Sequence, residues 1–200
     1  MRELLRELTA LPGVSGREEQ VREFIIRQIE GHCAWQVDPL GNLLVEKKGS
    51  RPAAHRVQFS AHMDEVGFLI TYLEEDGTLR FDAVGGVDAR IAAGKPVLVG
   101  QALLPGVIGV KPIHLLSKEE RAKAPQLEDL AIDIGCTSRA EAEALVQPGE
   151  PVVFLSDFTP YGEGFLKAKA LDDRAGCALL IRMIQSELPY DCLFSFTVQE

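Results

Sequence analysis

The sequence has no long apolar run. Its longest such stretch, Val66 to Leu73, is interrupted by Gly67 and Thr71 and is far too short to span a bilayer. The segment from Met1 to Leu8 alternates charge with leucine, whereas a secretion signal has a basic stretch followed by an uninterrupted apolar one. These features predict a cytoplasmic protein with no membrane partner.

Positive charge is also scarce. The chain has 21 Lys and Arg against 30 Asp and Glu, a formal net charge of -9, and its basic residues form no run interleaved with aromatic ones. A protein that binds nucleic acid needs a basic surface to neutralise phosphates. We therefore expect no nucleic-acid partner.

Cysteine is sparse and scattered. The four cysteines lie far apart and form no C-x-x-C pair, which argues against a structural zinc knuckle or a redox motif. Reduced thiols in a cytoplasmic protein are the simplest interpretation.

The pattern of apolar residues indicates an α/β fold with an insertion. Two helices are expected first, the second opened by a capping box at Ser15 to Glu18, followed by a hairpin around Asp38 to Gly41 and a strand that leads into His62. Short β-rich segments separated by Gly and Pro turns then predict a small barrel or sandwich. After Gly162 a helix and a strand restore the α/β pattern. We expect catalytic-domain segments at 1–66 and 161–200, the second incomplete, and an inserted β-rich domain at 67–160.

Three acidic clusters fall at strand ends or at loop-to-helix junctions, where α/β proteins place their chemistry. In an extended backbone His62 and Asp64 project to the same side, so Asp64 can orient the imidazole toward a metal. The alternative is a strand-end histidine beside an N-capping aspartate. Asp172 can bridge two divalent ions or can simply cap a helix. Glu200, after an apolar strand, can act as a general base or can be a solvated terminus.

The combination resembles a known family. The order of His62-Met63-Asp64-Glu65, Ala170-Leu171-Asp172-Asp173-Arg174 and Thr197-Val198-Gln199-Glu200 is similar to that in the dinuclear metallo-aminopeptidases that form tetrahedral shells. That family includes glutamyl and deblocking aminopeptidases, and some members carry an endoglucanase label. The resemblance covers nearly the whole chain and implies a zinc-peptidase-like mixed sheet flanked by helices.

The resemblance also implies roles for individual residues. His62 and Asp172 would bind two divalent ions, zinc or cobalt, with Asp172 as the bridge. Asp64 would orient His62, Asp173 would support the site, and Glu200 would be the general base. The enzyme would hydrolyse residues from the N-terminus of short peptides. The inserted domain would mediate assembly of a homo-oligomer, with dimers building to a dodecamer.

One departure from the family pattern concerns the metal ligands. Family members continue past the Gln-Glu pair with a further Glu, an Asp and a His that complete the coordination of the two ions. This sequence stops at Glu200. We expect the 200 residues to be the first part of a longer enzyme, with weak metal binding and little activity when isolated. Two alternatives are an inactive truncated homologue that acts only in assembly, and a glycan hydrolase. The second has little support from 6% aromatic residues and a single Trp.

Overall fold

The computed structural model describes the backbone of residues 1–200 and all side chains except those of Ile113, Glu120 and Arg121. The chain forms two compact units, each with its own hydrophobic core. Unit 1 combines Met1–Glu65 with Asp157–Glu200, and unit 2 is Val66–Ser156. The predicted α/β class is confirmed, since a mixed sheet flanked by helices forms unit 1.

Unit 1 is built on a four-stranded sheet in the order β1-β2-β12-β3. Its strands are β1 (Ala34–Val37), β2 (Leu43–Lys47), β3 (Gln58–His62) and β12 (Cys192–Thr197). β1 and β2 form the predicted hairpin, and β12 pairs antiparallel with β2 but parallel with β3. Two strands far apart in sequence therefore end at the same edge of the sheet.

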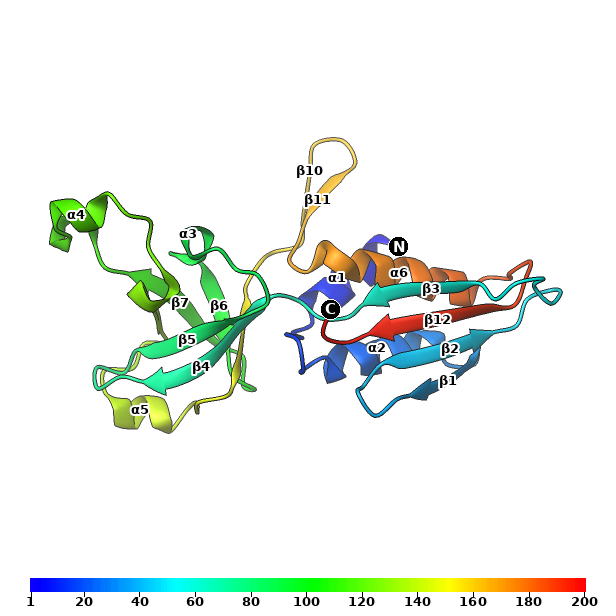
Figure 1. Ribbon diagram of the computed structural model, residues 1–200, viewed down its shortest axis with the longest axis horizontal. Helices are drawn as coiled ribbons and strands as arrows, with labels where there is room; N and C mark the ends of the chain where they lie inside the picture. The colour runs from blue at the N-terminus through cyan, green and yellow to red at the C-terminus, as the bar shows by residue number, and fades with distance from the viewer. The chain divides into compact units, whose positions relative to one another are not determined.

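Three helices pack against one face of this sheet (Figure 1). They are α1 (Arg2–Ala10), α2 (Glu19–Ile29) and α6 (Leu171–Gln185). Each turns an apolar stripe inward, as the spacing of Leu4 and Leu8 in α1 predicts. The stripes meet Phe194 and Phe196 of β12 in a single buried cluster. Unit 1 also contains a short hairpin of β10 (Thr159–Tyr161) and β11 (Phe165–Lys167).

The predicted capping box at Ser15 to Glu18 is wrong. Helix α2 begins at Glu19, its N-cap residue is Glu18, and no side chain makes a cap hydrogen bond. The Ser15 hydroxyl instead donates to Asp64, and the Glu18 carboxylate accepts from the N–H groups of Gly16 and Gln199. Ser15 and Glu18 thus form hydrogen bonds with residues distant in the sequence in place of the helix-capping hydrogen bonds that the sequence pattern favours.

Unit 2 is a closed barrel with the strand order β4-β5-β8-β7-β6-β9. The strands are β4 (Gly67–Leu73), β5 (Leu79–Val84), β6 (Pro96–Val99), β7 (Leu104–Val110), β8 (Leu130–Asp133) and β9 (Pro151–Phe154). The connections contain α3 (Ala89–Ala92), α4 (Lys118–Arg121), α5 (Arg139–Glu143) and the 3₁₀ turns Ile113–Leu115 and Leu127–Asp129. Closure gives each strand a neighbour on both sides, with β5 and β8 joined only through Leu79 and Ile132. In the part of the chain that the structure describes, no helix has the length and apolar character needed to cross a membrane.

Phe68 is the aromatic centre of the barrel core. Its fully buried ring meets the rings of Phe81 and Phe154 edge-on, at centroid distances of 4.7 and 5.2 Å. We predict that Phe68→Ala lowers the free energy of unfolding by about 3–5 kcal/mol, because it removes these contacts and leaves a cavity. Urea unfolding followed by circular dichroism measures the change. Ile91→Ala in the same unit is the control, since Ile91 is 61% exposed, and should cost under about 0.5 kcal/mol. Equal costs for the two changes would contradict the prediction.

Candidate active site

The parallel pair β3 and β12 brings the first and last acidic clusters together. His62 ends β3 and is the register partner of Thr197, which ends β12, and the N–H of Met63 donates to the carbonyl of Thr197 at 2.8 Å. The residues that follow the two strands therefore leave the same edge of the sheet. In α/β folds this carboxyl edge is where ligands bind.

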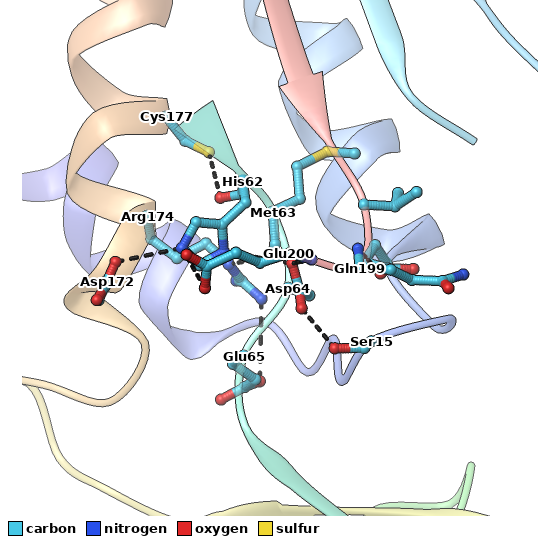
Figure 2. A network of polar contacts seen from close by, with 12 residues as sticks. Ser15, His62, Met63, Asp64, Glu65, Asp172, Arg174, Cys177, Gln199 and Glu200 are labelled. Atoms are coloured by element: carbon cyan, nitrogen blue, oxygen red, sulfur yellow. Dashed lines mark hydrogen bonds and ion pairs between the residues drawn. The ribbon is translucent and has the colours of Figure 1, made fainter. Parts of the chain in front are cut away.

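The His62 ring lies among three carboxylates. Its Nδ1 is 3.3 Å from Oδ1 of Asp64, while its Nε2 is 3.2 Å from Oδ1 of Asp172 and 3.4 Å from Oε2 of Glu200. Figure 2 shows Asp172 and Glu200 turned toward the ring. Asp64, Asp172 and Glu200, the other residues singled out in the sequence, thus meet around the imidazole of His62.

Burial divides this group into a fixed pair and an open pair. The side chains of His62 and Asp64 are 14% and 7% exposed, whereas those of Asp172 and Glu200 are 95% and 73% exposed. Burial lowers the pKa of His62, but the hydrogen bond to Asp172 and the charges of Glu200 and Asp64 outweigh it, so this pKa is raised. Nε2 of His62 therefore faces two exposed carboxylates, while Nδ1 faces the buried carboxylate of Asp64.

The start of α6 separates the roles of its two aspartates. Asp173 accepts a hydrogen bond from the N–H of Gly176 at 2.9 Å, which is the capping contact considered for this pair. Asp172 has a non-helical backbone, and its carboxylate faces His62 instead. Gly176 allows this arrangement, because a Cβ there would collide with the Asp173 carboxylate.

A buried charge network lies behind the site, and the sequence analysis missed it. Arg174 is fully buried and donates to the carbonyls of Met63 and Leu8, each at 2.6 Å. It approaches Glu65 at 3.9 Å, and its Nη2 has no hydrogen-bond partner among the described residues. Burial lowers the pKa of Arg174, and the charge of Glu65 opposes this change. Arg174 therefore anchors the segment that follows His62.

Lys169 completes the network. Its Nζ lies 2.6 Å from Oε1 of Glu65 and donates to the carbonyl of Leu11 at 2.9 Å. The two charged side chains are 9% and 3% exposed. Burial lowers the pKa of Lys169, and the charge of Glu65 acts in the opposite direction. Glu65 lies about 100 positions before Lys169 and Arg174 in the chain, so no local pattern in the sequence indicates that these charges pair.

The donor set suits a divalent metal but is incomplete. An imidazole nitrogen whose second nitrogen is oriented by a carboxylate is a common zinc ligand, and an exposed aspartate beside it supplies a second donor. Among the residues that the structure describes, no group of three or more His, Cys, Asp and Glu has the arrangement to hold an ion. His62 and Asp172 would provide two of the ligands, fewer than a closed zinc shell requires.

Comparison with known proteins decides the family. The profile of the M42 glutamyl aminopeptidases matches residues 41–200. The chain belongs to the M42 family. A curated relative from Acetivibrio thermocellus, named as a candidate aminopeptidase, is 39% identical to the M42 chain. The match covers all of the M42 chain and 58% of the relative.

Solved structures agree on this fold. The M42 chain is 44% identical to an endoglucanase from Thermotoga maritima, with a TM-score of 0.84 over 98% of the chain and 59% of that protein. It is 42% identical to the TET1 peptidase of Pyrococcus horikoshii, with a TM-score of 0.87 over 99% of the chain and 61% of that protein. That peptidase is described as assembling into a tetrahedron or a large octahedral shell. The M42 chain thus spans about three fifths of the length of each of these relatives.

The Lys169–Glu65 pair generates a stability prediction for the M42 chain. We expect Lys169→Met and Glu65→Gln each to lower the free energy of unfolding by about 3–5 kcal/mol, because each change removes the nearest partner of a buried charge. The double variant should lose clearly less than the sum, as a double-mutant cycle from urea unfolding would measure. The exposed pair Arg6–Glu3, changed to Met and Gln, is the matched control and should couple by under about 1 kcal/mol. Additive losses at the buried pair would show that the contact contributes nothing.

Proposed function

We propose that this chain supplies part of the active site of a dinuclear metallo-aminopeptidase, which hydrolyses the first peptide bond of short peptides. The observation that carries the proposal is the ring of His62, whose Nε2 lies within 3.4 Å of two exposed carboxylates. Membership of the M42 family supports the same reaction class.

His62 and Asp172 would hold the metal, with Asp172 as the bridge between two ions, zinc or cobalt. When bound, the ions would polarise the scissile carbonyl and acidify a water molecule. Asp64 would hold the tautomer of His62 that leaves Nε2 free for coordination.

Glu200 would act as the general base. Its carboxylate is 73% exposed at the open side of the site, so it can reach a water molecule and a substrate. It would take a proton from the water and deliver it to the leaving amine. Asp173, engaged with Gly176, would support the start of α6 instead of binding metal.

Unit 2 would serve in assembly. Unit 2 exposes several large apolar side chains, among them Leu115 at 60% and Leu145 at 51%. The shells formed by the TET1 peptidase of Pyrococcus horikoshii support a homo-oligomer, in which dimers would build to a dodecamer. Light scattering on the full natural polypeptide would test the proposed assembly.

The name of the Thermotoga maritima relative favours a second candidate, hydrolysis of a β-glucan. A retaining or inverting glycosidase uses two carboxylates on either side of a sugar. In this site both exposed carboxylates face the same imidazole nitrogen, an arrangement that suits metal binding better. Hydrolysis of aminoacyl chromogenic substrates, with a β-glucan assayed alongside, distinguishes the two activities.

Three variants of the full natural polypeptide test the assigned roles. We predict that His62→Ala and Asp172→Asn lose bound metal, measured by elemental analysis, together with aminopeptidase activity. Glu200→Gln should retain metal and lower kcat by about 10²–10⁴, the usual contribution of a general base. Glu163→Gln changes a glutamate in the turn between β10 and β11 and should leave both quantities unchanged.

Three results would contradict the proposed roles or the proposed reaction. Full metal content in the double variant His62→Ala/Asp172→Asn would remove both residues from the metal site. Unchanged kcat in Glu200→Gln would remove Glu200 from the proton transfer. Turnover of β-glucan without turnover of aminoacyl substrates would replace the proposed reaction by the second candidate.

A further inference from the structure

The turn that carries Glu200 is held by three side chains from three different segments. After β12 ends at Thr197, the N–H of Val198 donates to Oδ1 of Asn42 at 2.9 Å. The next two N–H groups, of Gln199 and Glu200, donate to Oε1 of Glu18 at 3.1 Å and to Oδ1 of Asp64 at 3.3 Å. Side-chain acceptors thus continue the hydrogen bonding where the strand ladder stops.

These backbone contacts matter because packing does not hold the Glu200 side chain. That side chain is 73% exposed, so its position depends on the backbone that presents it. Gln199, the residue before it, has a φ of 53°, in the left-handed region that residues other than glycine seldom adopt. A turn of this kind persists only when its surroundings impose it.

Glu18 stabilises the backbone turn at Gln199. The residue is 3% exposed, and its Oε1 accepts from the N–H of Gly16 at 2.8 Å as well as from that of Gln199. A buried carboxylate that binds two backbone N–H groups ties the loop before α2 to the turn after β12. Since the Glu18 side chain makes no cap hydrogen bond in α2, its carboxylate acts through the N–H groups of Gly16 and Gln199.

Ser15 contacts Asp64, the residue that faces Nδ1 of His62. Its hydroxyl donates to Oδ2 of Asp64 at 2.5 Å, whereas Oδ1 of the same carboxylate faces Nδ1 of His62 and the N–H of Glu200. Figure 2 shows this contact on the side of Asp64 away from Asp172. With both oxygens engaged, the Asp64 carboxylate cannot rotate away from the imidazole.

We propose that Ser15 and Glu18 are positioning residues of the site. Ser15 orients Asp64 and, through it, the metal-facing nitrogen of His62. Glu18 fixes the turn that presents the Glu200 carboxylate. The inference rests on the proposed function for its chemistry, but the contacts themselves can be tested without any substrate.

Removing each contact should affect a different quantity in the full natural polypeptide. We expect Ser15→Ala to weaken zinc affinity about 10- to 100-fold, the usual effect of losing a group that orients a ligand. Glu18→Ala should leave zinc affinity unchanged and lower kcat about 10- to 100-fold, with KM within about twofold. Ser15→Thr and Glu18→Gln, which keep a hydroxyl and an acceptor oxygen, should recover most of each loss.

The controls are the same substitutions at positions outside the site. Ser138 accepts from the N–H of Glu141 as the N-cap of α5, and Glu141 accepts from the N–H of Thr137. Ser138→Ala and Glu141→Ala thus remove comparable backbone contacts in unit 2. Neither should change zinc affinity or kcat.

Amide hydrogen exchange provides the readout that is independent of activity. Glu18→Ala should speed exchange at Gln199 and Glu200, while Glu18→Gln should keep these amides protected. Unchanged exchange in Glu18→Ala, or unchanged zinc affinity in Ser15→Ala, would overturn the corresponding positioning role. Faster exchange in a protein that hydrolyses no aminoacyl substrate would overturn the proposed function and leave the positioning of the turn intact.

Discussion

The candidate site depends on the parallel pairing of β3 with β12. These strands are separated by more than 130 positions in the sequence, yet their register aligns His62 with Thr197. A shift of one residue would reverse the faces of β12 and move Phe194 and Phe196 out of the core, so the hydrophobic pattern fixes this register firmly. The energy of the apolar core thereby sets the separation between His62 and Glu200.

Behind this edge, unit 1 contains an unusual amount of buried charge. Glu65, Lys169 and Arg174 lie together under the segment that carries His62 and Asp64, and most of their polar atoms contact backbone carbonyls or one another. A buried ion pair seldom adds net stability compared with apolar residues of the same size. What it provides here is a directional constraint on the backbone from Met63 to Glu65, which apolar packing cannot supply.

The inserted barrel is stabilised independently of unit 1. Its six strands close on themselves around a core centred on Phe68, so the unit has hydrogen-bonding partners for its edges and a core independent of unit 1. The chain can therefore interrupt unit 1 between Glu65 and Asp157 without leaving either unit short of buried apolar area. In the candidate site, the contacts of His62 with Asp172 and Glu200 join residues before this insertion to residues after it.

The sequence by itself determined the elements and the main chemical groups. Helical spacing of leucines located α1, the Asp38 turn located the first hairpin, and Gly and Pro spacing indicated the β-rich insertion, because these signals come from short-range periodicity and turn chemistry. Motif order singled out His62, Asp64, Asp172 and Glu200, which the structure brings together around one ring.

Only the tertiary structure decided what Ser15, Glu18 and Lys169 do. Ser15 and Glu18 have the spacing of a helix cap, and Lys169 looks like an ordinary surface charge, yet each has its functional partner at least 49 positions away in the chain. The two aspartates at the start of α6 also become distinguishable only once Asp173 has engaged Gly176 and Asp172 faces His62. A polar side chain takes whichever partner the fold places within reach, and that choice depends on contacts between distant segments that no local pattern encodes.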